Sequence, residues 1–327
     1  MLPLLSLTRN RRFIARLALV FILLTSCLGA FTQTTVNKKK VTPDEIRALH
    51  MTASKSTIFG IVEGLTEYLP ISSTGHLILT QYLMHMHPKD ENTKKAMDAY
   101  EVIIQAGAIL AVLFLYFGRV KSVWNGLMGR DEAGKKLGIN ILVAFLPAAI
   151  IGYVLSHFGI LEKLFYLQVV VWAWFIGGLF VLYVARKHTD PHAGDEMASI
   201  TPKKAFAIGL MQCIAMCPGV SRSFATIFGG LLIGLSPIAA VEFSFLLGLV
   251  TLTAATVYSA MKSYAVLPIV GAGNLLIGFA VSAIAAFFAV SWMVGYLNRR
   301  GFAIFGYYRL AMGLGIGALI YMGYILH

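Results

Sequence analysis

The apolar residues of the chain gather in six long runs separated by polar connections. The runs cover residues 97–118, 137–157, 165–185, 237–261, 268–297 and 302–324. A helix of roughly 20 residues crosses about 30 Å of hydrocarbon, so each run is long enough to span a membrane. Charged residues make up only 13% of the chain, whereas soluble domains average about 25%. We therefore predict an all-α polytopic membrane protein with six transmembrane helices.

Two further apolar stretches, residues 60–76 and 209–226, are interrupted in the middle. Pro70 breaks the first and Pro218-Gly219 breaks the second, and hydroxyl residues follow each break. Each half is too short to cross a membrane alone. We interpret both stretches as re-entrant helix hairpins, which exist at membrane depth only where protein or water covers the freed backbone groups.

The two interrupted stretches align with each other at a constant offset, so that Gly60 matches Gly209 and Ser72 matches Ser221. Three predicted spans, an odd number, separate the stretches, so the two copies would enter the membrane from opposite sides. This is an inverted-topology repeat, an arrangement that transporters also use. We predict one membrane domain over residues 51–327, made of repeats at about 54–185 and 202–325.

Lysine and arginine concentrate in alternate connections between the spans. The rich connections are residues 119–136, 186–204 and 299–300. The other connections carry Lys163 and Lys262, and the segment before the first span carries Lys89, Lys94 and Lys95. The positive-inside rule places the rich connections in the cytoplasm. The formal net charge of +12 then reflects loop bias and contact with anionic membrane lipids, and it requires no nucleic acid.

Residues 1–50 precede the membrane domain as a separate extension. Arg9, Arg11 and Arg12 come before an apolar run at residues 13–24, which is typical of a signal peptide or signal anchor. The alternative is that translation starts at Met51 and that the upstream stretch is a mis-assigned start.

Two carboxylates stand four residues apart in the first interrupted stretch. Glu63 and Glu67 share one face of a helix at this spacing. Paired carboxylates in an apolar setting repel each other unless a positive charge lies between them, and hard divalent cations such as Mg²⁺ or Ca²⁺ prefer oxygen ligands. We therefore expect a divalent cation as cofactor, against the alternative of two solvated carboxylates at a helix start.

Hydroxyl residues cluster after both breaks, with Arg222 among those of the second copy. If both half-helices begin near the membrane midplane, their positive ends and free N–H groups converge on an anion site. An arginine there suits bidentate contact with phosphate. Simple helix capping is the alternative for one hydroxyl in each copy, and an ion pair with Glu63 or Glu67 is the alternative for Arg222.

His76 follows Ser72 and Ser73 by one helical turn, which places it on the same helix face as these hydroxyls. It could act as the base for a serine nucleophile or as the nucleophile itself. The other charged or polar residues inside spans are expected to support the bundle or the site. They are Glu101, Gln105, Glu242, Tyr307, Tyr308 and Arg309. For Cys213 and Cys217 we favour packing over metal or redox chemistry.

The segments 63–76 and 218–226 resemble the two signature motifs of the undecaprenyl-diphosphate phosphatase family, also called the bacitracin-resistance phosphatases. The resemblance extends from about Ser54 to the C-terminus and includes residues 101–105 and 242–247. It implies hydrolysis of undecaprenyl diphosphate to the monophosphate at the outer face of the bacterial inner membrane. Such a reaction recycles the lipid carrier for peptidoglycan synthesis and gives bacitracin resistance.

The same resemblance implies roles for the polar residues of both motifs. Ser73 and His76 would be the catalytic pair, joined by Glu67, and Glu63 and Glu67 would bind the metal. The implied diphosphate-binding residues are Arg222, Ser221, Ser223, Ser72, Thr74 and Thr226. The implied partners are a polyprenyl diphosphate and membrane lipids, with a homodimer left open.

One position departs from the family pattern. The family has glycine after Ser-Arg-Ser in the second motif, whereas this chain has Phe224; the first copy keeps Gly75 at the equivalent place. We expect the benzyl side chain to crowd the approach of the two tips or of the lipid.

A different class of function uses the same architecture. A flippase or transporter of a phosphorylated lipid or small anion also combines inverted repeats with half-helices at the midplane. Such a carrier needs donors for its anion but has little use for two carboxylates beside a serine and a histidine. A silent scaffold predicts no clustering of these residues, so we favour the phosphatase.

Overall fold

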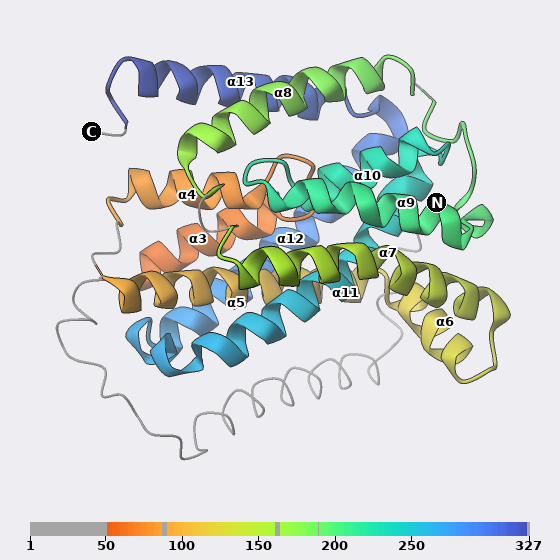
Figure 1. Cartoon of the computed structure of the whole chain (residues 1–327), viewed down its shortest axis with the longest axis horizontal. Coiled ribbons are helices and arrows are strands. Elements are labelled where there is room, and N and C mark those ends of the chain that lie inside the picture. Colours follow the sequence, from red (N-terminus) through yellow and green to blue (C-terminus); the bar gives the residue numbers. More distant parts are fainter. Residues whose placement is uncertain (1–50, 87–89, 161–163, 189, 326–327) are drawn as a thin grey trace. The chain divides into compact units, whose positions relative to one another are not determined.

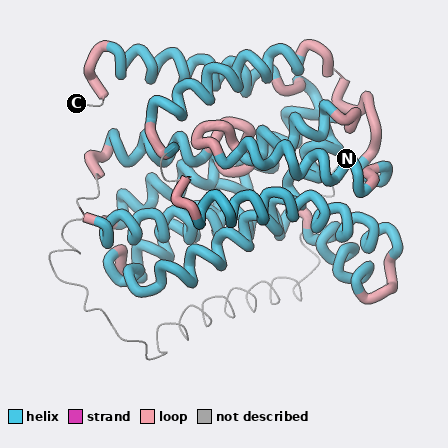
Figure 2. The backbone as a smooth tube through the Cα atoms, viewed as in Figure 1, coloured by secondary structure: helices cyan, strands magenta, loops and turns pink. Residues whose placement is uncertain are grey.

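The computed structural model describes residues 51–86, 90–160, 164–188 and 190–325. The predicted extension at residues 1–50, and also Lys89 and Lys163, lie outside the described residues. The described part is helical, without a named strand (Figures 1 and 2). Its α-helices are α3 (Ala53–Thr66), α4 (Ser73–Leu83), α5 (Glu91–Leu115), α6 (Phe117–Leu127), α7 (Glu132–His157), α8 (Leu167–Ala185), α9 (Pro202–Cys213), α10 (Arg222–Leu232), α11 (Pro237–Ser263), α12 (Ala272–Arg300) and α13 (Ala303–Tyr321). Three short 3₁₀ helices are η3 (Met197–Ser199), η4 (Ile214–Met216) and η5 (Tyr264–Ile269).

Six of these helices, α5, α7, α8, α11, α12 and α13, are long and apolar enough to cross a membrane. They confirm the six predicted spans, with shifted ends. The first starts at Glu91 because the Asp90 side chain accepts hydrogen bonds from the N–H groups of Asn92 and Thr93 and caps the helix. The fifth starts only at Ala272, because Pro268 belongs to η5.

Each interrupted stretch forms two short helices joined at a break, α3 with α4 and α9 with α10. Ser72 caps α4 and Ser221 caps α10, and their φ angles are 76° and 78°. A positive φ is uncommon for serine and is retained where the surroundings impose it. The two breaks therefore share one backbone geometry, while the depth of either helix pair in a bilayer stays a prediction.

The first helix of each broken pair packs against a long helix from the other half of the chain. α3 lies against α12 and α9 lies against α7, while α5 also contacts α12 and α11 also contacts α7. α8 and α13 run side by side (Figure 1). Gly60 and Gly209 allow the close approaches, because a Cβ on Gly60 would stand 2.6 Å from the carbonyl oxygen of Gly278, and one on Gly209 would collide with the backbone of Ala144. Each half of the chain thus buries its broken helix against the other half, and the repeat boundaries stay a prediction.

Candidate active site

Glu67 joins the two motifs into one polar cluster. Its Oε2 accepts a hydrogen bond of 2.5 Å from the Ser73 hydroxyl, and its Oε1 accepts one of 3.3 Å from Nη2 of Arg222. Glu67 lies at the break after α3, Ser73 at the start of α4 and Arg222 at the start of α10. All three are largely removed from solvent. The fold therefore brings a hydroxyl, a carboxylate and a guanidinium from both motifs into direct contact.

Arg222 is fixed from several sides. Its Nη1 donates to the Ser244 carbonyl oxygen at 3.1 Å, and its guanidinium lies 4.9 Å from the ring centre of Tyr68. Gly248 of α11 leaves room for the guanidinium, since a Cβ there would collide with it. Nε of Arg222 has no hydrogen-bond partner among the described residues. The Glu67 contact matches the ion pair that we considered for Arg222, and the free donor leaves capacity for a further acceptor.

Glu63 lies one helical turn before Glu67 and is 1% exposed. Its Oε2 has no hydrogen-bond partner among the described residues. The alternative of two solvated carboxylates is therefore wrong, because both side chains are buried. A buried carboxylate oxygen without a donor fits a cation. No group of three or more His, Cys, Asp or Glu side chains is assembled in the described part of the chain, so hydroxyls, water or phosphate would supply the remaining ligands of such a cation.

The remaining hydroxyls mostly hold the two breaks together. Ser223 donates to the Leu69 carbonyl oxygen at 2.9 Å and is 2.9 Å from the Ser221 hydroxyl. Ser72 accepts from the N–H of Gly75 as the cap of α4. The Thr226 hydroxyl is 2.6 Å from that of Ser244. Each of these predicted diphosphate ligands therefore has a protein partner, whereas the Thr74 hydroxyl has none among the described residues.

His76 is near Ser73 in sequence but is not bonded to it. Its Nδ1 is 2.6 Å from the Ser72 carbonyl oxygen and its Nε2 is 2.7 Å from the Tyr308 hydroxyl. Its ring also lies 5.0 Å from that of Trp174. Both ring nitrogens are therefore occupied, and the carboxylate of Glu67, rather than His76, is the hydrogen-bond partner of Ser73.

Two fully buried side chains, Trp174 and Arg309, fasten the breaks to α8 and α13. Trp174 Nε1 donates to the Ile71 carbonyl oxygen at 2.9 Å. Arg309 donates to four backbone carbonyl oxygens, those of Pro70, Ala173, Gly219 and Val220, at 2.8 to 3.2 Å. Arg309 thereby bridges both breaks. Our sequence interpretation gave Arg309 a supporting role but missed Trp174, whose only signal was a polar N–H inside an apolar run.

Phe224 packs against Arg309, the residue that bonds to both breaks. Its ring lies 4.6 Å from the Arg309 guanidinium carbon and 4.9 Å from the Phe228 ring. At the equivalent place in the first motif, a Cβ on Gly75 would stand 2.7 Å from the Trp174 ring. The two motifs therefore differ at this equivalent position. In the first motif the Trp174 indole packs against Gly75, and in the second the Phe224 ring packs against the Arg309 guanidinium.

We expect Phe224→Gly to lower the free energy of unfolding by about 2 kcal/mol, because it removes a partly buried ring and adds a flexible residue to α10. Thermal unfolding of the purified protein in detergent measures this, with Phe224→Leu as the control that keeps apolar bulk. An unchanged Tm together with faster turnover would show that the ring only obstructs the site.

Two secondary candidates have polar partners outside the two motifs. Glu242 forms an ion pair with Arg119 at 2.7 Å, and Glu101 accepts a hydrogen bond of 2.6 Å from Gln81. Cys213 and Cys217 are both free thiols. These contacts agree with supporting roles.

A family model described as bacitracin resistance protein BacA matches residues 56–315, which include both motifs. The chain belongs to this family. Undecaprenyl-diphosphatase 2 of Rhodospirillum rubrum is 42% identical over 271 residues, which are 83% of this chain and 96% of that protein. Undecaprenyl-diphosphatase of Herminiimonas arsenicoxydans is 41% identical over 281 residues, 84% of this chain and 97% of that protein. Undecaprenyl-diphosphatase of Bdellovibrio bacteriovorus is 41% identical over 269 residues, 82% and 95% of the two chains. BacA membership and the six apolar helices make the chain a multi-pass membrane protein.

Proposed function

We propose that the protein hydrolyses undecaprenyl diphosphate to undecaprenyl phosphate and phosphate. The observation that carries this proposal is the contact of Ser73 and Arg222 with the two oxygens of one carboxylate, Glu67. A nucleophile, its base and a phosphate-binding guanidinium are the parts that phosphoryl transfer needs. The similar proteins are named as hydrolases, so the flippase or transporter alternative is not favoured.

Ser73 acts as the nucleophile in this proposal. Its Oγ attacks the terminal phosphorus while its proton passes to Oε2 of Glu67, which lies 2.5 Å away. The bond from that phosphorus to the bridging oxygen breaks, and undecaprenyl phosphate leaves with the bridging oxygen and with the proton that Glu67 received. A water molecule then attacks the phosphoserine, which releases phosphate and restores the hydroxyl. His76 does not take this proton, because both of its ring nitrogens have other partners.

Arg222 binds the diphosphate in this proposal. Its Nε has no partner in the described structure, and its 3.3 Å bond to Glu67 is long enough to exchange for a phosphate oxygen. The N-terminal ends of α4 and α10 both start at this cluster and add positive ends of helix dipoles. Ser221 and Ser223 hold the two breaks in register through the Leu69 carbonyl.

Glu63 and Glu67 would hold a divalent cation, Mg²⁺ or Ca²⁺. When bound, the cation would offset the negative charge of the diphosphate. Mg²⁺ in particular is often held by one or two carboxylates together with water and substrate phosphates, which agrees with a site of only two acidic residues. Glu63 would otherwise keep a buried oxygen without a donor.

We expect hydrolysis to require a divalent cation, and Glu63→Gln to raise the concentration of Mg²⁺ needed for half-maximal rate by at least about tenfold, because one of two anionic ligands is lost. Phosphate release from purified protein given farnesyl diphosphate measures both, with and without chelator. Glu132→Gln is the control, since Glu132 is exposed and lies outside the cluster. Full turnover in excess EDTA would show that hydrolysis does not need a divalent cation.

We expect Arg222→Lys to lower kcat/KM by about a hundredfold or more, because a point charge cannot replace a planar fork that contacts Glu67, Ser244 and a phosphate together. Steady-state kinetics with farnesyl and undecaprenyl diphosphate test this. Arg300→Lys at the exposed end of α12 is the control. A variant with wild-type kinetics on both substrates would leave Arg222 a purely structural role.

An apolar groove of about 470 Å³ suits the isoprenoid chain of the substrate. Its walls include Leu69, Ile71, Trp292, Phe305 and Tyr308. The groove meets the polar cluster at two points, because the Leu69 carbonyl accepts from Ser223 and the Tyr308 hydroxyl contacts His76. A diphosphate at Arg222 would therefore place the first isoprene units beside these apolar walls.

The proposal includes the inner membrane as the location and an opening of the site toward its outer face. The distribution of lysine and arginine in the sequence and the resemblance to the phosphatase family support this orientation. The other proposed partner is a second copy of the chain. Formation of such a homodimer would not be needed to complete the site, because the described residues of the cluster all come from one chain.

A further inference from the structure

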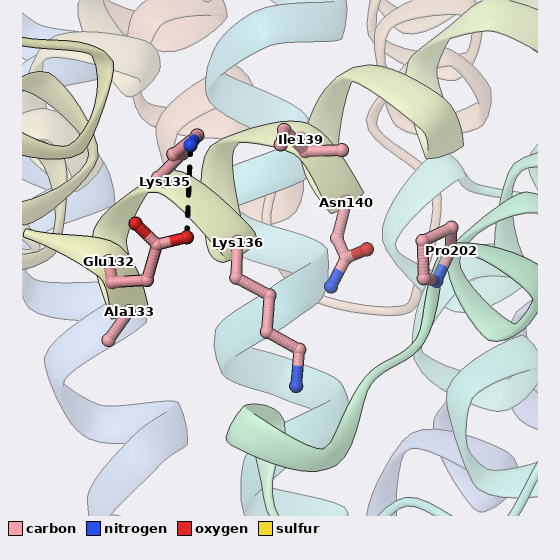
Figure 3. A pocket seen from close by; sticks show the side chains of 7 residues that line it. All are labelled: Glu132, Ala133, Lys135, Lys136, Ile139, Asn140 and Pro202. Carbon is pink, nitrogen blue, oxygen red and sulfur yellow. Dashed lines mark ion pairs between the residues drawn. The ribbon is translucent and has the colours of Figure 1, made fainter. Parts of the chain in front are cut away.

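A second pocket lies at the N-terminal ends of α7 and α9, among residues that do not belong to the motif cluster. Its volume is about 390 Å³. Figure 3 shows the side chains of Lys136 and Asn140 extending from α7 toward the same side, with Pro202 of α9 beside them. Glu132, Lys135 and Ile139 complete the part of the wall that α7 supplies.

Asn140 presents an unsatisfied acceptor in this pocket. Its Nδ2 donates to the Ile200 carbonyl oxygen at 2.8 Å, which fixes the orientation of the amide. The residue is only 2% exposed, and its Oδ1 is buried without a hydrogen-bond partner in the described part of the chain. Buried polar atoms are nearly always hydrogen-bonded, either to protein or to ordered water, so we expect a water molecule or a ligand to donate to this atom.

Two lysines beside Asn140 have donors to spare. Lys136 Nζ donates to the Ala198 carbonyl oxygen at 2.7 Å and has further N–H groups available. Lys135 Nζ forms an ion pair of 3.8 Å with the Glu132 carboxylate, and its side chain is 49% exposed. The first turns of α7 and α9 also direct their positive ends here. The ligand should therefore combine an anionic group for the lysines with a donor for Asn140.

The surfaces next to the pocket are apolar. α7 exposes Leu142 and Leu146, and α9 exposes Phe206 and Leu210. Both helices start at the pocket and pack tightly against each other where Gly209 meets Ala144. α7 is one of the six long apolar helices, so the pocket lies at the polar end of a span, where lipid headgroups are found. Acyl chains could run along these exposed faces.

We propose that this pocket binds a glycerophospholipid headgroup in which a phosphate ester is joined to an N–H or O–H donor, as in phosphatidylethanolamine or phosphatidylglycerol. The phosphate contacts Lys135 and Lys136, and the amine or hydroxyl donates to Asn140 Oδ1. The site is separate from the proposed hydrolytic cluster, so its test does not depend on that activity.

Native mass spectrometry of the purified full-length chain tests the proposal by counting retained lipids. Phosphatidylethanolamine, phosphatidylglycerol and phosphatidylcholine are compared in the unchanged protein, because the choline headgroup keeps the phosphate but lacks a donor. Lys135→Ala and Lys136→Ala are each compared with Lys203→Ala, an exposed lysine that does not line the pocket. Size-exclusion elution verifies that every variant is folded.

We expect both donor lipids to be retained over phosphatidylcholine, and each pocket-lysine variant to weaken retention by about fivefold while Lys203→Ala does not. Equal retention of all three lipids, or equal loss in Lys203→Ala, would overturn the proposal. Displacement of the lipid by millimolar O-phosphoethanolamine would identify a soluble phosphate ester as the ligand and would overturn the assignment to a membrane lipid.

Discussion

Replacing Ser73 with alanine is expected to lower kcat for polyprenyl diphosphate hydrolysis by at least about a thousandfold, because the variant loses the attacking oxygen and keeps only binding and electrostatic contributions. Glu67→Gln should cause a loss of similar size, since Glu67 is both the hydrogen-bond acceptor for Ser73 and the partner of Arg222. Phosphate release at saturating substrate, measured on folded protein in detergent, gives both values. The double variant should be little worse than either single one, because the two residues act as a unit.

Two further variants separate Ser73 from its neighbours. Ser54→Ala is the control, as it removes an exposed hydroxyl of α3 that lies outside both motifs. His76→Gln should cost less than about a hundredfold, the lower range for losing a general base, because His76 is bonded to Ser72 and Tyr308 instead. If His76→Gln is as inactive as Ser73→Ala and Ser73→Ala retains a covalent phosphoenzyme, then His76 is the nucleophile.

Replacing Arg309 with methionine is expected to destabilise the protein by on the order of 4 kcal/mol, which corresponds to a fall in Tm of about 10 °C. Four backbone carbonyl oxygens of the two breaks and of α8 would lose their donor, and a fully buried apolar side chain cannot replace it. The free energy of burying the guanidinium offsets part of this loss. Thermal unfolding followed by size-exclusion measures the change.

Arg309→Lys should fall between wild type and Arg309→Met, because one ammonium reaches fewer of the four carbonyls than a planar fork does. Arg300→Met removes an arginine at the exposed end of α12 and should leave Tm unchanged. Wild-type stability of Arg309→Met would mean that the breaks hold their backbone geometry without this residue. Reduced turnover in Arg309→Lys at temperatures where it stays folded would show that the clamp also positions the site.

The membrane architecture was predictable because it depends on local composition. A run of about 20 apolar residues has one stable outcome in a bilayer, and all six runs form helices. The breaks were equally local, since Pro70 and Pro218 disfavour continuation of a helix and the serines after them cap the next one. Helix ends moved by several residues where a cap such as Asp90 or a proline such as Pro268 decided the boundary.

The partners within the site were decided by tertiary structure. Sequence spacing placed His76 and Ser73 on one helix face, but the carboxylate of Glu67 folds back across the break to Ser73, while Tyr308 of α13 engages His76. Spacing along one helix cannot reveal a contact with an element more than two hundred residues away. The contact of Trp174 with Ile71 and the four bonds of Arg309 are hidden from sequence for the same reason.

The sequence by itself determined the helical membrane fold, the two matched breaks and the set of polar residues at them, because these follow from hydrophobic runs, prolines and motif order. Only the tertiary structure decided that Arg222 and Ser73 meet on Glu67, and that the Phe224 ring packs against Arg309. Those outcomes depend on which helix of one half packs against which helix of the other half. Such long-range pairing is set by the shapes of whole helix faces. Gly60 and Gly209 contribute to it because they allow close approach of the backbones.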